Sequence, residues 1–154
     1  MNTKKTIAND LFFASVEEFL KEGRSVEMTV KGYSMRPFLR SERDVVILAP
    51  LAKDAPLRRG QVVLFRQQGR HILHRYVGER RGECVMKGDG NYRIEEVVPR
   101  GDVVAYVSAV KLSNGRRIAY RGLCWRVRTL WSRGVKLLRT VAVDVKHKII
   151  KQEI

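Results

Sequence analysis

The segment DVVILAPLAKDAPLRRGQVVLFRQQGRHILHRYVG, residues 44–78, decides the fold class of this chain. It contains three short runs rich in valine, isoleucine and leucine, and these are separated by turn residues such as glycine and proline. Runs of this length and composition are typical of β-strands. Over the whole chain seven segments qualify: 25–30, 44–50, 61–67, 71–78, 83–89, 102–112 and 116–120. We therefore predict a compact, mostly antiparallel β-domain of six or seven strands. The Asn-Gly pair in SNG, residues 113–115, suits a hairpin turn between the last two.

Helical periodicity occurs at the two ends of the chain. Asn9 or Asp10 can cap a short helix that runs to about Glu22, and Gly23 is a plausible stop signal. From residue 122 to 151, apolar residues return at steps of three and four and form one stripe: Leu123, Val127, Leu130, Gly134, Leu138, Val141, Val145 and Ile149. Basic residues lie off that stripe: Arg126, Arg133, Lys136, Arg139 and Lys146. The pattern predicts a mostly β (α+β) protein with a domain at 1–121 and a long basic amphipathic helix at 122–154.

Three placements of the C-terminal helix are compatible with this pattern. It packs on its own β-domain, lies on an anionic membrane surface, or binds a partner protein. No stretch approaches the roughly 20 apolar residues that a membrane-crossing helix needs. The apolar patch near the N-terminus is interrupted by acidic residues, unlike a secretory signal. We expect a cytoplasmic protein, at most peripheral at the inner membrane surface.

Composition restricts the partners. The 154 residues carry a net charge of +15, which favours an anionic partner such as a membrane, an acidic peptide or a nucleic acid. Aromatic residues make up only 8% and sit mostly in apolar positions, so nucleic-acid binding is not expected. Cys84 and Cys124 are too few for a disulfide framework and fit reduced thiols. No cysteine or histidine spacing predicts a metal site, and we expect no cofactor.

Polar residues at three predicted strand ends have the chemistry of a hydrolase. Ser34 lies in the turn after residues 25–30, His74 in the segment 71–78, and Asp89 in MKGDGN. A serine hydroxyl becomes a nucleophile when a base within hydrogen-bond reach takes its proton, and a carboxylate can orient an imidazole base. His71 competes with His74 for the role of the base. Many β-proteins contain these residue types, so their order alone does not decide between a catalytic site and ordinary polar residues.

Four short motifs resemble the type I signal peptidase superfamily, which includes the self-cleaving LexA-type repressors. VKGYSMRPFLRSERDVVIL, residues 30–48, is similar to the nucleophile motif Gly-x-Ser-Met-x-Pro followed by Asp, with matches at Gly32, Ser34, Met35, Pro37 and Asp44. RRGQVVLFRQ is similar to the strand that follows, with Gln61 in place of an acid. HILHRYV resembles the base motif of the endoplasmic-reticulum and archaeal type, which carries a His-Arg pair where other members carry lysine. MKGDGN is similar to its Lys-Gly-Asp-Asn-Asn motif. The resemblance covers roughly residues 26–112, and RGDVVAYVSAV, residues 100–110, fits the closing strand.

This resemblance implies a serine endopeptidase on a compact antiparallel β-domain. Ser34 would attack the scissile carbonyl and His74 would be the general base. The orienting acid would be Asp89 or Glu95, which has Glu96 beside it, and we favour Asp89 because Glu95 needs a longer reach. The substrate, a leader or pro-segment of a peptide or protein, would bind near Gly32, Tyr33, Met35 and Pro37. Gly32 stands where signal peptidases carry a hydroxyl residue, and the chain has no predicted span. The alternatives are a non-catalytic peptide-binding module of the same fold and a basic protein that binds nucleic acid or a membrane surface.

Overall fold

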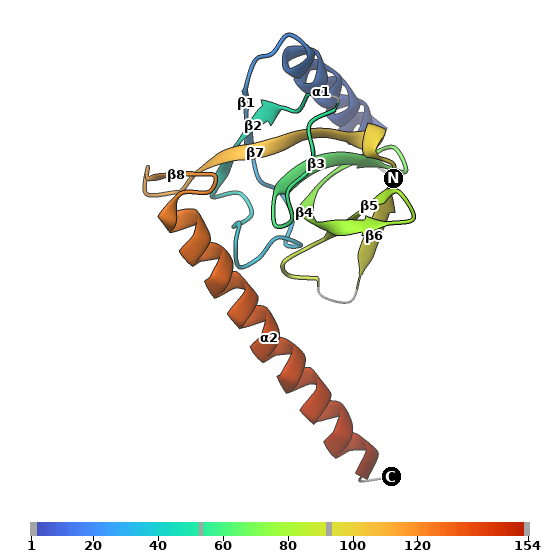
Figure 1. Cartoon of the computed structure of the whole chain (residues 1–154), viewed down its shortest axis with the longest axis vertical. Helices are drawn as coiled ribbons and strands as arrows, with labels where there is room; N and C mark the ends of the chain where they lie inside the picture. The colour runs from blue at the N-terminus through green and yellow to red at the C-terminus, as the bar shows by residue number, and fades with distance from the viewer. Residues whose placement is uncertain (1–2, 53, 92–93, 153–154) are drawn as a thin grey trace.

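The chain forms a curled antiparallel β-sheet with one helix at each end of the sequence (Figure 1). The structure is a computed structural model that describes residues 3–52, 54–91 and 94–152, with side chains described except at 3–9, 136 and 139–152. The elements in chain order are α1 (Thr3–Lys21), β1 (Val26–Thr29), β2 (Val45–Pro50), β3 (Val62–Gln67), β4 (Arg70–Arg80), β5 (Glu83–Lys87), β6 (Glu95–Val98), a 3-10 turn η1 (Arg100–Asp102), β7 (Val103–Lys111), β8 (Arg117–Ala119) and α2 (Leu123–Gln152). The predicted mostly β class is therefore confirmed.

The strands follow the order β1-β2-β7-β3-β4-β5-β6, and β8 pairs with β7 as the predicted hairpin. All seven segments predicted as strands contain a strand, but the sequence reading missed β6. Its two leading glutamates, Glu95 and Glu96, do not read as a strand. The segment becomes one because it pairs with β5, Met86 opposite Glu96 and Cys84 opposite Val98.

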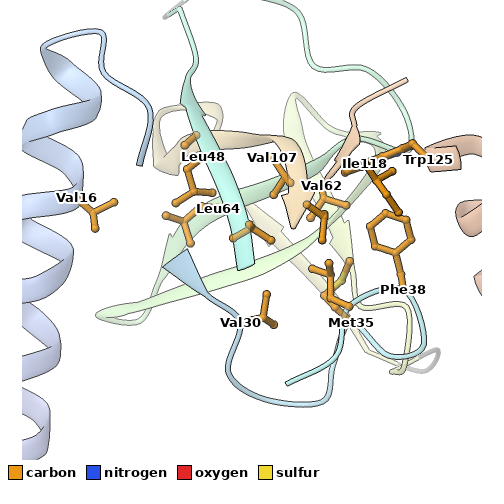
Figure 2. Packing of buried hydrophobic residues seen from close by; sticks show 14 of the residues in the cluster. Val16, Val30, Met35, Phe38, Leu48, Val62, Leu64, Val107, Ile118 and Trp125 are labelled. Carbon is orange, nitrogen blue, oxygen red and sulfur yellow. The ribbon is translucent and has the colours of Figure 1, made fainter. Parts of the chain in front are cut away.

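Alternation along the strands divides the core into two clusters. On β3, Val62 and Leu64 face the larger cluster, while Val63 and Phe65 face the smaller one. The larger cluster lies between the sheet and the two helices, and it includes Val16 of α1, Phe38 of the β1–β2 connection and Trp125 of α2 (Figure 2). The smaller cluster lies on the opposite face of β3–β5 and includes Tyr76 and Met86.

Helix α1 is longer than the sequence indicated. It begins at Thr3, so the expected start at Asn9 or Asp10 is wrong, whereas its end at Lys21 agrees with the predicted stop at Gly23, which has φ +80°. Val16 and Leu20 are buried in the larger cluster.

Helix α2 docks through a face that the apolar stripe did not indicate. Trp125, Arg128 and Ser132 turn toward the domain, and Trp125 packs edge-on against Phe38 with ring centroids 4.9 Å apart. Four residues of the predicted stripe are exposed instead: Leu123, Val127, Leu130 and Leu138. The side chains of Val141, Val145 and Ile149 lie outside the described part. Past its first turns, α2 extends away from the sheet (Figure 1). Neither described helix combines the length and apolar character needed to cross a membrane.

The two tryptophans of α2 provide a matched test of this docking. Trp125 is 4% exposed and Trp131 is 54% exposed. We expect Trp125→Ala to lower the free energy of unfolding by about 3–5 kcal/mol, because it leaves a cavity in the core. Trp131→Ala should change it by less than about 1 kcal/mol. Urea denaturation monitored by circular dichroism measures both, and equal losses would contradict this packing.

Candidate active site

The turn that carries Ser34 lies between β1 and β2 and is held by apolar side chains. Met35, Phe38 and Leu39 are buried in the larger cluster. Gly32 has φ +93°, a conformation that favours glycine, and its N–H donates to Ser41 Oγ at 3.0 Å. The Arg36–Pro37 peptide is cis. Because Met35 turns inward, Ser34 remains at the half-buried edge of the turn.

A buried carboxylate connects this turn to α2. Asp44 accepts hydrogen bonds from the Arg40 backbone N–H at 2.9 Å and from the Arg40 guanidinium at 3.1 Å. Arg128 of α2 also donates to Asp44 at 3.1 Å, and its Nε donates to the Phe38 carbonyl at 2.6 Å. Burial lowers the pKa of Arg128 from its usual value, and the Asp44 carboxylate opposes that effect. The turn is therefore attached to both the sheet and α2.

His74 is paired with Glu96, a residue that the sequence hypothesis did not choose. The Nδ1 of His74 and the Glu96 carboxylate lie 2.9 Å apart, and both side chains are largely buried. His74 is on β4 and Glu96 is on β6, so the contact reaches across β5. At that point the chain after β5 carries Gly88, whose lack of a side chain leaves room for the His74 ring.

The pairing with Glu96 determines the form of the imidazole. An ionised carboxylate only accepts hydrogen bonds, so a neutral imidazole beside it carries its proton on Nδ1 and presents a lone pair at Nε2. Nε2 is buried, and among the described residues it has no hydrogen-bond partner. A buried nitrogen without a partner costs about 1–3 kcal/mol, and a catalytic role is one of the explanations for such a group in a folded protein. In that tautomer the accepting atom of His74 has no partner among the described residues.

The GDG loop at residues 88–90 brings the serine turn to His74. The Gly90 N–H donates to the Ser34 carbonyl at 2.7 Å. A Cβ atom on Gly88 would lie 2.6 Å from the Ser34 carbonyl oxygen and 3.1 Å from His74 Nε2, so these two atoms flank a single point. The Ser34 carbonyl oxygen and the His74 ring therefore lie on either side of Gly88. The Ser34 hydroxyl makes no hydrogen bond to His74, whose Nε2 is without a partner among the described residues.

His71 contacts helix α1 and not the serine turn. Its Nε2 lies 2.8 Å from the Glu17 carboxylate of α1, and its ring stacks on Phe13 with centroids 4.1 Å apart. His71 and His74 are three positions apart on β4 and therefore face opposite sides of the sheet. This separates the two histidines that the sequence left as competitors.

Neither Asp89 nor Glu95 is hydrogen-bonded to His74, so the choice between them as the orienting acid needs correction. Asp89 makes a buried bidentate pair with Arg75, at 2.9 and 2.6 Å, and accepts from the Ser132 hydroxyl at 2.9 Å. Arg75 follows His74 directly on β4 and therefore points to the opposite face of the sheet, where it binds Asp89.

Glu95 faces away from His74 because neighbouring side chains on a strand point to opposite faces, and it is Glu96 that faces His74. It accepts hydrogen bonds from Arg80 at 2.8 Å and Lys87 at 3.3 Å, and these two cations lower the pKa of its carboxyl. Glu96 and Val98 share the other face of β6, the face of the smaller cluster. The sequence signal for Glu96 was this two-residue spacing to a buried valine, which has meaning only once β6 is recognised.

The expected substrate-binding residues differ in accessibility. Tyr33 is 66% exposed, with the Arg36 guanidinium over its ring at 4.4 Å, and Pro37 is half-buried. Gly32 is exposed, whereas Met35 is buried in the core and offers no surface to a ligand in this conformation. The Ser34 backbone N–H donates to no other described residue, so it is free to bind an oxyanion.

A search against protein-family models and a search of curated proteins each found no match to this chain. Within the described ranges, no three His, Cys, Asp or Glu residues are grouped so that they could hold a metal ion. Both cysteines are free thiols, and burial raises the pKa of Cys84.

Two glycines test the close approach of the GDG loop. We expect Gly88→Ala to destabilise the protein by about 1–3 kcal/mol, because the added methyl meets the Ser34 carbonyl. Gly101→Ala is the matched control, since a Cβ there meets nothing within 4 Å, and its effect should stay within about 0.5 kcal/mol. Urea denaturation curves measure both. Equal stability of the two variants would show that the loop does not touch the serine turn.

Proposed function

We propose that this protein is a serine endopeptidase related to the signal peptidase and LexA-type superfamily, with Ser34 as nucleophile, His74 as general base and Glu96 as the acid that orients His74. One observation carries the proposal: the buried, unpartnered Nε2 of His74 lies beside the Ser34 turn while Glu96 occupies Nδ1. The four sequence motifs support the same assignment. The replacement of Asp89 or Glu95 by Glu96 keeps the chemistry of a Ser-His-acid site and changes only the source of the carboxylate.

The mechanism follows from these positions. The Ser34 Oγ attacks the scissile carbonyl carbon, and its proton passes to His74 Nε2. Glu96 stabilises the imidazolium that forms, and the Ser34 N–H donates to the oxyanion. His74 then gives the proton to the leaving amine, and water hydrolyses the acyl-enzyme by the same route in reverse. Catalytic hydrogen bonds are often long without substrate, so the lack of a Ser34–His74 hydrogen bond in the unbound chain is compatible with this mechanism.

The proposed substrate is an extended peptide segment, such as a leader or pro-segment, that pairs with the backbone beside Ser34. The exposed ring of Tyr33 lies next to the nucleophile and would contact the substrate on that side. The net charge of +15 would favour acidic leaders. We place the activity in the cytoplasm, for which the two free thiols are the supporting feature.

Removal of the nucleophile or the base should abolish cleavage without unfolding the protein. We expect Ser34→Ala and His74→Ala each to lower the cleavage rate by at least about 10³-fold, because neither leaves a complete proton-transfer pair. The measurement is mass spectrometry of a defined peptide library incubated with wild type and each variant. Cleavage by Ser34→Ala at the wild-type sites would refute the peptidase assignment. Binding of library peptides without any cleavage by wild type would favour the non-catalytic module.

Adjacent glutamates give a matched test of the orienting acid. We expect Glu96→Gln to lower the cleavage rate by about 10²- to 10⁴-fold with little change in KM, because the amide does not stabilise the imidazolium. Glu95→Gln should stay within about threefold of wild type, since Glu95 faces Arg80 and Lys87. The same peptide assay measures both rates. A larger loss for Glu95→Gln than for Glu96→Gln would contradict this assignment.

A further inference from the structure

Helix α2 has two faces that point in opposite directions. The docking face consists of Trp125, Arg128 and Ser132, which contact the domain. At about 100° per residue, the apolar residues Leu123, Val127, Leu130 and Leu138 lie on the other side of the helix. We call these four residues the outer stripe. All four are exposed, Leu130 at 66% and Leu138 at 72%, so the intramolecular packing does not use them. Large apolar side chains gathered on one exposed face usually indicate a binding surface.

The outer stripe continues into a hollow beside the root of α2. This hollow has a volume of about 390 Å³ and lies between α2 and the β7–β8 hairpin. Its wall is mostly apolar and is formed by Leu112, Ile118, Leu123, Cys124, Val127 and Trp131, with Arg116 and Arg128 also present. The apolar surface of α2 therefore extends onto the β-domain at this end.

The charge around the outer stripe has one sign. Between Leu123 and Leu138 the helix contains no acidic residue, and Arg126 and Arg133 are exposed on it. Three further exposed arginines precede the helix: Arg116, Arg117 and Arg121. A second copy of this chain paired along the same stripe would set one group of arginines against another, without an acidic residue between Leu123 and Leu138 to offset them, which is unfavourable. An anionic lipid surface complements both the cations and the apolar residues.

We propose that the outer stripe of α2 binds the surface of an anionic membrane, with the helix lying in the plane of the headgroups. The docking face remains in contact with the domain, so membrane binding requires no release of Trp125 or Ser132. Arg128 and Ser132 connect α2 to the serine turn and the GDG loop, which holds the candidate active site close to the bound surface. The membrane proposal does not depend on peptidase activity.

Vesicle binding tests this proposal. The full-length protein is mixed with vesicles of phosphatidylcholine alone or with about one-third phosphatidylglycerol, and bound protein is measured by flotation. We expect binding to the anionic vesicles only. Leu130→Ser and Leu138→Ser should each weaken binding by about tenfold, because each removes an apolar side chain that would be buried in the bilayer. Arg126→Gln and Arg133→Gln should each weaken it by about fivefold.

Leu11→Ser on α1 is the matched control, because Leu11 is 67% exposed but lies far from the outer stripe in the sequence. It should bind as wild type does, and circular dichroism should show all variants folded. Wild-type binding by Leu130→Ser with Leu138→Ser in one chain would overturn the proposal. Equal binding to neutral vesicles would also overturn it. So would a dimer in light scattering that these two substitutions dissociate, because a second copy would then cover the stripe.

Discussion

The rest of the site depends on the contact between the GDG loop and the serine turn. Gly90 donates its N–H to the Ser34 carbonyl at 2.7 Å. At Gly88 there is no room for a side chain between that carbonyl and the His74 ring. Two backbones approach this closely only where both side chains are hydrogen atoms or point elsewhere. Asp89, between the two glycines, turns to the opposite face, where it binds Arg75 and Ser132. Three consecutive residues therefore join the serine turn, the histidine strand and α2.

The acidic residues near this contact divide into two roles. Asp44 and Asp89 are buried and are hydrogen-bonded to arginines, Asp44 to Arg40 and Arg128 and Asp89 to Arg75. Breaking such a pair leaves a buried charge without a partner, which is strongly destabilising, so these carboxylates hold the architecture. Glu96 differs because its partner is the imidazole of His74. In the proposed mechanism it is the carboxylate that would stabilise the imidazolium.

Helix α2 has an attachment face and an exposed apolar face on opposite sides. Trp125, Arg128 and Ser132 attach it to the core, to the serine turn and to the GDG loop. The outer stripe contributes nothing to that attachment. An amphipathic pattern is thus not by itself evidence of which surface an apolar face will cover. Here the more polar face makes the intramolecular contacts. Arg128 and Ser132 donate to the buried carboxylates of Asp44 and Asp89, and Trp125 packs in the core.

The sequence by itself determined the β class, seven of the strands and the presence of both helices, because local pattern and turn chemistry are written in neighbouring residues. It also put forward Ser34 as a candidate nucleophile, with His71 and His74 as candidate bases. Only the tertiary structure decided which histidine lies beside the serine turn, which carboxylate contacts that histidine and which face of α2 packs on the domain. His71 and His74 differ by the side of a sheet that each faces, and Glu95 and Glu96 differ in the same way. β6 exists because β5 supplies its hydrogen bonds, and Gly88 lets the Ser34 carbonyl and the His74 ring lie close together because it has no side chain. These are relations between segments far apart along the chain, so no local pattern contains them.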